Sequence, residues 1–207
     1  MRWSVVMPVK RLEQAKSRLA VTAEDRVSLA LAMALDTASV ALGSPRVGLL
    51  VVVSDDPVAG PALAALGAVV LADEPDAGLN AALSHGAAAA TARAPAYGVA
   101  FLTCDLPALQ ADELTRAFDL AGNHERALVA DAGGDGTTLL TAAPGVAPRP
   151  SFGAGSRARH ADEGAVVLAA RRLAGLRRDV DTVADLQAAR RLGVGPRTAF
   201  VLSRERR

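Results

Sequence analysis

The sequence has 207 residues, of which 51% are hydrophobic, and a formal net charge of +1 at pH 7. This length suffices for one domain with a full hydrophobic core, and we expect a single domain over residues 1–207. The near-neutral charge and the few aromatic residues argue against a nucleic-acid partner, and the single cysteine, Cys104, excludes an internal disulfide and a cysteine-based zinc site.

Apolar runs in this sequence are short. The run 47–53 is far shorter than a membrane span, and the N-terminal residues lack the long apolar region and cleavage site of a signal peptide. We therefore expect a cytoplasmic protein without a membrane partner.

Apolar runs and helix-forming segments alternate along the chain. Continuous apolar runs are typical of buried parallel strands. The predicted strands lie within 3–9, 46–56, 69–74, 98–109, 126–132 and 137–143, and the predicted helices within 28–42, 60–68, 78–94, 112–122, 165–174 and 183–192, with a glycine-rich loop at 149–164. This alternation indicates an α/β fold with a parallel, helix-covered sheet, whose ligands bind beyond the carboxyl ends of the strands.

The loop after the first predicted strand carries both lysines of the chain. Lys10 and Lys16 lie in the segment PVKRLEQAKSRLA, together with Arg18. Nucleotide-binding sheets hold phosphates in such a loop, so we interpret all three residues as nucleotide-binding and the two lysines also as catalytic. The dinucleotide fingerprint and the P-loop motif are both absent. The alternative is a solvated basic helix start.

Three aspartates close apolar segments. Asp105 ends the strand in FLTCDLPAL, and Asp179 and Asp181 lie in LRRDVDTVADLQ. Residues i and i+2 of an extended segment point the same way, and Mg²⁺ prefers carboxylate oxygens. We therefore predict a magnesium site of Asp105, Asp179 and Asp181, with Asp105 also catalytic. We expect Thr182 and Asp185 to form a capping box for the next helix, which leaves the pair Asp179 and Asp181 without a capping role. The alternative is that the three aspartates only belong to turns.

Two glycine-rich turns, GGDGTT and SFGAGSRARH, offer hydroxyls and backbone amides. These groups would surround an anionic substrate as a nest, to which basic side chains of the second turn could add charge. The nest residues are Thr137, Thr138, Gly153, Gly155 and Ser156, and the basic residues are Arg157, Arg159 and His160. The alternative is a pair of ordinary hairpin turns.

Some polar positions allow two interpretations. Asn80 at a helix start is either a nucleotide contact or an N-cap, and the SDDP segment at 54–57 either contacts a ribose or starts a turn. Asp131 and Asp135 more readily bond their own backbone than a metal.

The combination of motifs resembles a known family. The segments PVKRLEQAKSRLA, LAMALDT, CDLPAL, GDGTTLL, FGAGSRARH and DVDTVADLQAARRLGVG occur in this order over nearly the whole chain. Together they resemble the guanylyltransferases of coenzyme F-420 biosynthesis, which join GMP from GTP to phosphoenolpyruvate or 2-phospho-L-lactate. The resemblance implies a single Rossmann-like nucleotidyltransferase domain, of the nucleotide-diphospho-sugar transferase fold, with a mostly parallel sheet and magnesium dependence.

The resemblance also implies roles for individual residues. The family's metal-binding aspartates correspond to Asp105, Asp179 and Asp181, its acceptor pocket to Thr137, Gly153 and Ser156, and its basic triphosphate loop to Lys10 and Lys16. One departure is Asp135, which stands where the family often has threonine.

The expected reaction is an in-line attack of an acceptor phosphate oxygen on the α-phosphorus of GTP, with pyrophosphate as the leaving group. We expect phosphoenolpyruvate as the acceptor, with 2-phospho-L-lactate or 3-phosphoglycerate as alternatives. A cytidylyl- or molybdopterin-type nucleotidyltransferase and a non-catalytic nucleotide-binding regulatory module are the rival functions. A homodimer is left open.

Overall fold

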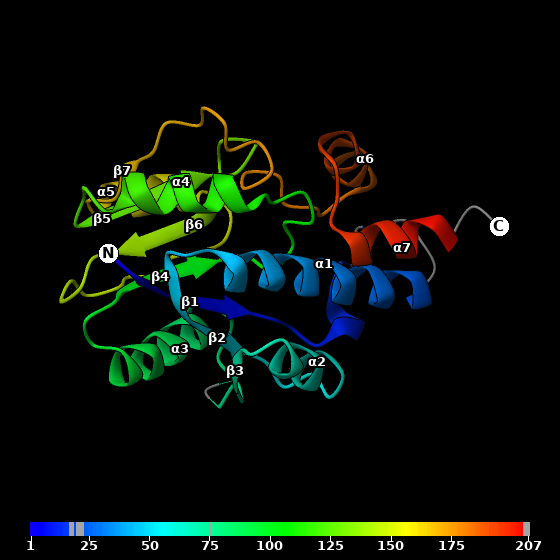
Figure 1. Cartoon of the computed structure of the whole chain (residues 1–207), viewed down its shortest axis with the longest axis horizontal. Helices are drawn as coiled ribbons and strands as arrows, with labels where there is room; N and C mark the ends of the chain where they lie inside the picture. The colour runs from blue at the N-terminus through cyan, green and yellow to red at the C-terminus, as the bar shows by residue number, and fades with distance from the viewer. Residues whose placement is uncertain (17–18, 20–22, 75, 205–207) are drawn as a thin grey trace.

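The computed structural model describes residues 1–16, 19, 23–74 and 76–204. Within these residues, a seven-stranded sheet lies at the centre and helices pack against both of its faces (Figure 1). The strands are β1 (Trp3–Pro8), β2 (Val47–Val53), β3 (Val69–Leu71), β4 (Gly98–Leu102), β5 (Arg126–Ala130), β6 (Thr137–Ala142) and β7 (Val166–Val167). The helices are a 3-10 turn η1 (Leu12–Gln14), α1 (Ala23–Gly43), α2 (Ala59–Ala65), α3 (Leu79–Arg93), α4 (Ala111–Ala121), α5 (Ser156–Asp162), α6 (Val183–Leu192) and α7 (Pro196–Arg204).

The strand order is β3-β2-β1-β4-β6-β5-β7. All described pairings are parallel except those of β6, which runs antiparallel to both β4 and β5. The predicted mostly parallel α/β sheet is therefore confirmed. The loops that follow β1, β2, β3 and β4 leave the sheet at one edge, which is the edge where ligands bind in such folds.

Alternation along β1 divides the core into two layers. Trp3, Val5 and Met7 face the layer that holds α1 and α4, while Val6 faces α3. The contact with α3 is close, because a Cβ atom at Gly86 would lie 2.5 Å from the Val6 side chain. These buried apolar contacts hold the strand ends, and hence the loops of the site, in fixed positions.

Helix α1 corrects one expectation about apolar segments. Its residues Glu24–Gly43 are long and apolar enough, with a mean hydropathy of 1.3, to meet the length and composition requirements of a membrane span. Half of that segment is buried, and Ala34, Ala38 and Ala41 contact the central core. The apolar composition of α1 is thus explained by packing on the sheet.

The helix predicted over 165–174 is wrong. Val166 and Val167 instead form the edge strand β7, parallel to β5, and turns follow. Two β-branched residues suit a strand, and Arg172 has a φ of 60°, which a helix interior does not allow. The loop predicted over 149–164 also contains the short helix α5, whose first residue is Ser156.

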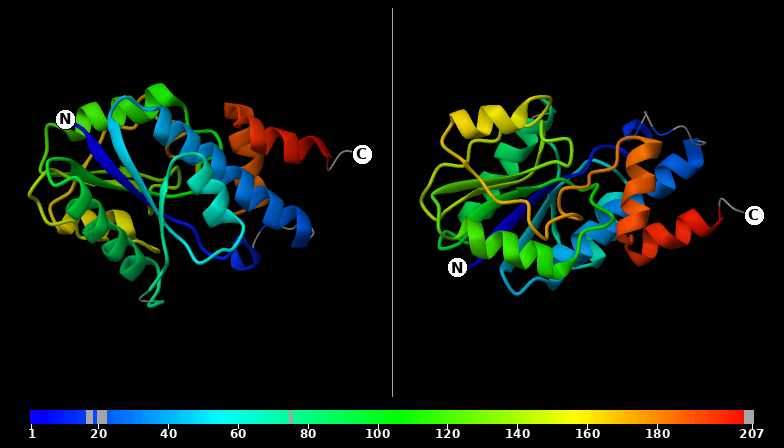
Figure 2. Two further views of the ribbon diagram at one scale, coloured as in Figure 1. Left: turned by 60° about the horizontal axis from the view of Figure 1, so that its bottom comes forward. Right: turned by 90° about the horizontal axis from the view of Figure 1, so that it is seen from above.

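The C-terminal helices α6 and α7 lie together at one end of the molecule, beside the start of α1 (Figure 2). Asp36 of α1 accepts hydrogen bonds from the backbone N–H groups of Arg197 (3.2 Å) and Thr198 (2.9 Å), which satisfies donors at the start of α7. The apolar cluster between these helices includes Val180, which is fully buried. The chain on either side of Val180, which carries Asp179 and Asp181, is thereby anchored.

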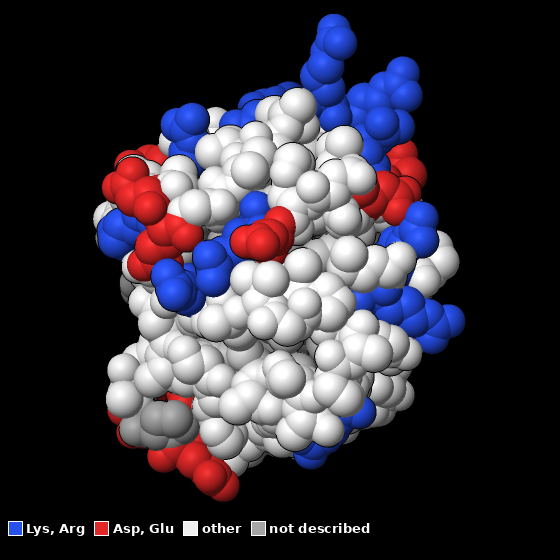
Figure 3. Space-filling model, turned by 90° about the vertical axis from the view of Figure 1, so that its left-hand side faces the viewer, with Lys and Arg blue, Asp and Glu red and all other residues white. Residues whose placement is uncertain are grey.

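The opposite end of the molecule carries charges of both signs (Figure 3). On this face, basic and acidic side chains are interspersed around a broad uncharged area, without one continuous positive surface.

Candidate active site

Lys16 lies between two of the predicted metal ligands. Its Nζ atom pairs with Oδ2 of Asp105 and, at 2.9 Å, with Oδ1 of Asp181. Burial alone would lower the pKa of Lys16, but the two carboxylates outweigh it and raise that pKa. The structure therefore brings together residues that are 89 and 165 positions apart in the sequence, around one fixed positive charge.

One oxygen of Asp105 and the carboxylate of Asp179 are less well compensated. Oδ1 of Asp105 is buried and accepts no hydrogen bond from any described residue. Burial, followed by the charges of Asp105, Asp131 and Asp181, raises the pKa of Asp179 to about 7. An unpaired carboxylate oxygen and crowded negative charges fit a divalent cation, which takes oxygen ligands.

In this structure Asp105, Asp179 and Asp181 are not arranged to coordinate one metal ion. Among the described residues, no group of three or more acidic, histidine or cysteine side chains is placed to hold a metal ion. The Lys16 ammonium instead separates Asp105 from Asp181. The assignment of Asp105, Asp179 and Asp181 as metal ligands stays a prediction.

The side chains of Glu113 and Arg177 anchor the loop that carries Asp179 and Asp181. The buried Glu113 at the start of α4 accepts hydrogen bonds from the backbone N–H groups of Gly175 (2.8 Å) and Leu176 (3.1 Å). Gly175 is required here, because a Cβ atom would lie 2.1 Å from the carbonyl oxygen of Ala108. The Arg177 guanidinium donates to the Ala130 carbonyl at the end of β5 (3.0 Å), which ties the loop to the sheet.

Thr137, Ser156 and His160, which the sequence suggested for the pocket of the acceptor substrate, form one buried cluster. The Ser151 backbone N–H donates to Nε2 of His160 (2.9 Å), so this nitrogen is unprotonated and Nδ1 carries the proton. Nδ1–H then donates to Oγ1 of Thr137 (3.0 Å), which also accepts the hydroxyl of Ser156 (3.3 Å). Both lone pairs of the Thr137 hydroxyl are therefore used within this cluster, and a contact of Thr137 with the substrate stays a prediction.

His160 is neutral in this cluster. Burial, and then the charge of Arg159, lowers the pKa of His160 to about 4. The expectation that His160 adds positive charge is therefore wrong. Arg159 donates to the carbonyl oxygens of Ser151 (2.9 Å) and Ala154, which places its charge at the loop itself.

Asp135, the departure from the family pattern, joins the two glycine-rich turns. Its Oδ2 accepts the backbone N–H of Gly155 at 2.8 Å, and its carbonyl accepts the N–H of Arg157 at 3.0 Å. The prediction that Asp131 bonds its own backbone is confirmed, since its Oδ1 accepts the N–H groups of Gly134 (2.6 Å) and Asp135 (3.0 Å). Both turns are thus rigidly connected.

Asn80 connects α3 to the loop that contains Gly153. Its amide accepts the N–H of Phe152 at 2.8 Å and donates to the carbonyl of the same residue at 3.2 Å. The N-cap interpretation is wrong, because Gly78 is the N-cap of α3. Contact of Asn80 with a nucleotide stays a prediction, and Gly153, exposed with a φ of 120°, stays a candidate for the acceptor pocket.

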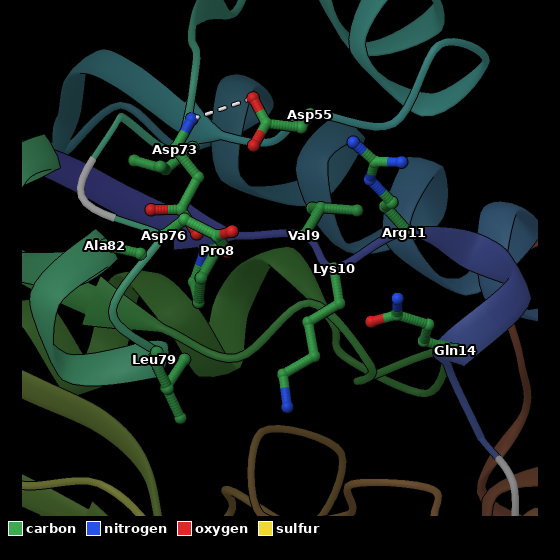
Figure 4. Close-up of a pocket in the computed structure, with 12 residues that line it drawn as sticks. Pro8, Val9, Lys10, Arg11, Gln14, Asp55, Asp73, Asp76, Leu79 and Ala82 are labelled. Carbon is green, nitrogen blue, oxygen red and sulfur yellow. Dashed lines mark hydrogen bonds between the residues drawn. The ribbon is translucent and has the colours of Figure 1, made fainter.

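Lys10 lies at the mouth of a cavity of about 400 Å³ between the ends of β1, β2 and α3 (Figure 4). It makes no ion pair with any residue that the structure describes, so its charge is available to a ligand. A second, more apolar cavity adjoins this one and is shared by Lys10, Lys16 and Asp105. Arg18, the third predicted basic residue of this loop, lies outside the described residues.

A sequence model of the family described as "Guanylyl transferase CofC like" matches residues 3–170. The chain belongs to this family. It is 55% identical over 206 residues to a phosphoenolpyruvate guanylyltransferase of Streptomyces coelicolor, with 99% of this chain and 97% of that protein covered. A phosphoenolpyruvate guanylyltransferase of Thermomonospora curvata is 54% identical, with 98% and 89% covered.

Solved structures agree on the fold of this family member. A candidate nucleotide-diphospho-sugar transferase of Desulfovibrio desulfuricans G20 superposes with a TM-score of 0.73 at 17% identity, with 99% of this chain and 95% of that chain covered. A Mycobacterium tuberculosis H37Rv protein in complex with manganese gives a TM-score of 0.50 at 18% identity, with 93% and 98% covered. The expected nucleotidyltransferase fold is therefore confirmed.

Glu113 and Arg177, which anchor the loop of Asp179 and Asp181, carry no functional signal in the sequence. In the sequence, Glu113 is only one of the acids in the first turn of a predicted helix, and Arg177 is only one arginine of a basic pair. Their partners are backbone groups 62 and 47 residues away, which leave no local pattern. A signal existed only for His160, which lies four residues after Ser156 and hence on the same face of a helix.

Proposed function

We propose that this protein transfers GMP from GTP to the phosphate of phosphoenolpyruvate, giving enolpyruvoyl-2-diphospho-5'-guanosine and pyrophosphate. The observation that carries the proposal is the identity of 54–55% to phosphoenolpyruvate guanylyltransferases over nearly the whole of this chain. The convergence of Lys16, Asp105 and Asp181 at the carboxyl edge of the sheet supports it, because phosphoryl transfer depends on positioning and charge neutralisation.

Each part of the site then has a chemical role. Lys10 and Lys16 bind the triphosphate, and the Lys16 charge stabilises the negative charge that develops on the leaving pyrophosphate. The acceptor phosphate is already ionised near neutral pH, so no side chain has to act as a base. The hydroxyl proton of Thr137, directed by His160 and Ser156, orients the acceptor through one of its oxygens.

We also propose that the reaction requires Mg²⁺ and that Asp105, Asp179 and Asp181 hold it. The unpartnered oxygen of Asp105 and the raised pKa of Asp179 support this assignment. When bound, a divalent cation supplies charge neutralisation at the phosphates. Lys16 would then leave Asp105 and Asp181 and turn its ammonium toward the triphosphate.

The decisive experiment measures pyrophosphate release from GTP and Mg²⁺. Phosphoenolpyruvate, 2-phospho-L-lactate and 3-phosphoglycerate are supplied one at a time, with ATP and CTP as nucleotide controls and EDTA as the metal control. The proposal predicts release with GTP and phosphoenolpyruvate only. Preference for another acceptor would correct the substrate, and nucleotide binding without pyrophosphate release from any combination would favour a regulatory module.

A further inference from the structure

The cavity beside Lys10 has an acidic wall opposite the lysine loop. Its lining includes the apolar side chains of Val9, Leu79 and Ala82 together with Asp55 and Asp73 (Figure 4). At about 400 Å³ it has the size of a small-molecule site. Polar and charged side chains, among them Lys10, Arg11 and Asp76, line it beside these apolar ones, so a flat heterocyclic base would find both apolar contacts and hydrogen-bond partners here.

Asp73 belongs to this wall and has one carboxylate oxygen without a partner among the described residues. Its backbone is fixed, because its N–H donates to Oδ1 of Asp55 at 3.0 Å and its carbonyl accepts the N–H of Asp76 at 3.0 Å. Its Oδ1, in contrast, is buried and has no hydrogen-bond partner among the described residues. A buried acceptor without a donor is costly and points to a ligand that supplies one.

The sheet topology separates Asp73 from Asp105 by about the distance between the base and the phosphates of a nucleotide. Asp105 follows β4, Lys10 follows β1 and Asp73 follows β3, in the spatial order β3-β2-β1-β4. Three inter-strand spacings separate the ends of β3 and β4, or about 14 Å. A nucleotide with its phosphates at Lys16 and Asp105 therefore crosses β1 and β2 with its ribose and reaches Asp73 with its base.

We propose that Asp73 is the residue that selects guanine, by accepting hydrogen bonds from N1–H and the 2-amino group of the base. A carboxylate only accepts hydrogen bonds, and guanine presents two adjacent donors on that edge. Adenine and cytosine each present an unprotonated ring nitrogen there, which the carboxylate repels. The inference rests on the proposed function in one respect, namely that the phosphates bind at Lys16 and Asp105.

The test is the nucleotide preference of Asp73→Asn. An asparagine amide donates a hydrogen bond to the 2-oxo group of xanthine but opposes the 2-amino group of guanine. We expect the kcat/KM for GTP to fall about 100-fold, the value for XTP to exceed that for GTP, and the KM for phosphoenolpyruvate to stay unchanged. The matched control is Glu74→Gln, which removes a charge from the adjacent exposed residue outside the cavity wall.

Calorimetric binding of GTP, XTP and ATP to the same variants needs no turnover. A wild-type protein that binds GTP over ATP without releasing pyrophosphate would refute the proposed function, while the binding preferences of Asp73→Asn would still decide the role of Asp73. An equal loss of GTP and XTP in Asp73→Asn would indicate a ribose contact and overturn the inference. The inference would also be overturned if Asp76→Asn, and not Asp73→Asn, lost the preference for guanine. A wild-type protein that binds no nucleotide would overturn it as well.

Discussion

Glu113 provides the sharpest test of how the site is supported. Its side chain is 8% exposed and accepts three backbone N–H groups, those of Gly175 (2.8 Å), Leu176 (3.1 Å) and Gln110 (3.2 Å). Glu113→Gln preserves the shape but replaces one of the two carboxylate oxygens by an NH2 group, which is a donor. In either orientation of the amide, at least one of the three backbone N–H groups loses its acceptor.

The expected cost follows from these contacts. A buried donor left without a partner costs about 1–3 kcal/mol, so we expect Glu113→Gln to lower the free energy of unfolding by about 2 kcal/mol. The loop that carries Asp179 and Asp181 loses its anchor as well. We therefore expect kcat/KM for pyrophosphate release to fall about 10-fold under conditions where the variant is fully folded.

Urea denaturation followed by circular dichroism measures the first effect, and the pyrophosphate assay measures the second. Asp112→Asn is the matched control, since Asp112 is the preceding acid of the same helical turn and is exposed. A Glu113→Gln variant within 0.5 kcal/mol of wild type would refute the reasoning, because surface substitutions alone produce changes of about that size. Reduced activity in the Asp112→Asn variant would contradict it equally.

Four further predictions address the remaining parts of the molecule. Burial lowers the pKa of His160 from its ordinary value of 6.5 to about 4 in the folded protein, so stability should be lost as pH falls from about 6.5 to 4, by up to about 3 kcal/mol. Urea titrations of wild type and His160→Gln over this pH range check this, and parallel pH profiles of the two proteins would contradict it. Thr137→Val should raise the KM for the acceptor about 10-fold with the KM for GTP unchanged, and Thr137→Ser should restore it; steady-state kinetics with each substrate varied decide. Gly86→Ala should lower the free energy of unfolding by about 1–3 kcal/mol, because its Cβ would lie 2.5 Å from Val6, and an unchanged urea midpoint would show that α3 shifts freely. Asp179→Asn should reduce turnover at least 100-fold, on the order of the loss of one electrostatic contact in a transition state, while the circular dichroism spectrum stays that of wild type; wild-type activity would remove Asp179 from the metal site.

Structural features that depend on neighbouring residues in the sequence were predictable. The apolar runs at 47–53 and 98–102 form buried parallel strands, and the Thr182–Asp185 capping box starts α6 as expected, with Thr182 Oγ1 accepting the Asp185 N–H at 3.2 Å. The expected α/β class follows from the same local patterns. The prediction failed at 165–174, where alanine and arginine favour a helix but the edge of β5 offers hydrogen bonds to Val166 and Val167.

Relations between distant segments depended on the tertiary structure. Nothing near Lys16 in the sequence indicates that its ammonium pairs with Asp105 and Asp181, and nothing near Asp73 indicates an acceptor left unpaired in a cavity wall. By itself the sequence determined the order of the strands and α-helices from β1 to β6 and the residue types available at their ends, because these depend on short-range periodicity and backbone preference. Only the folded chain decided which of those ends meet, because sheet order and burial arise from contacts between residues far apart in the chain.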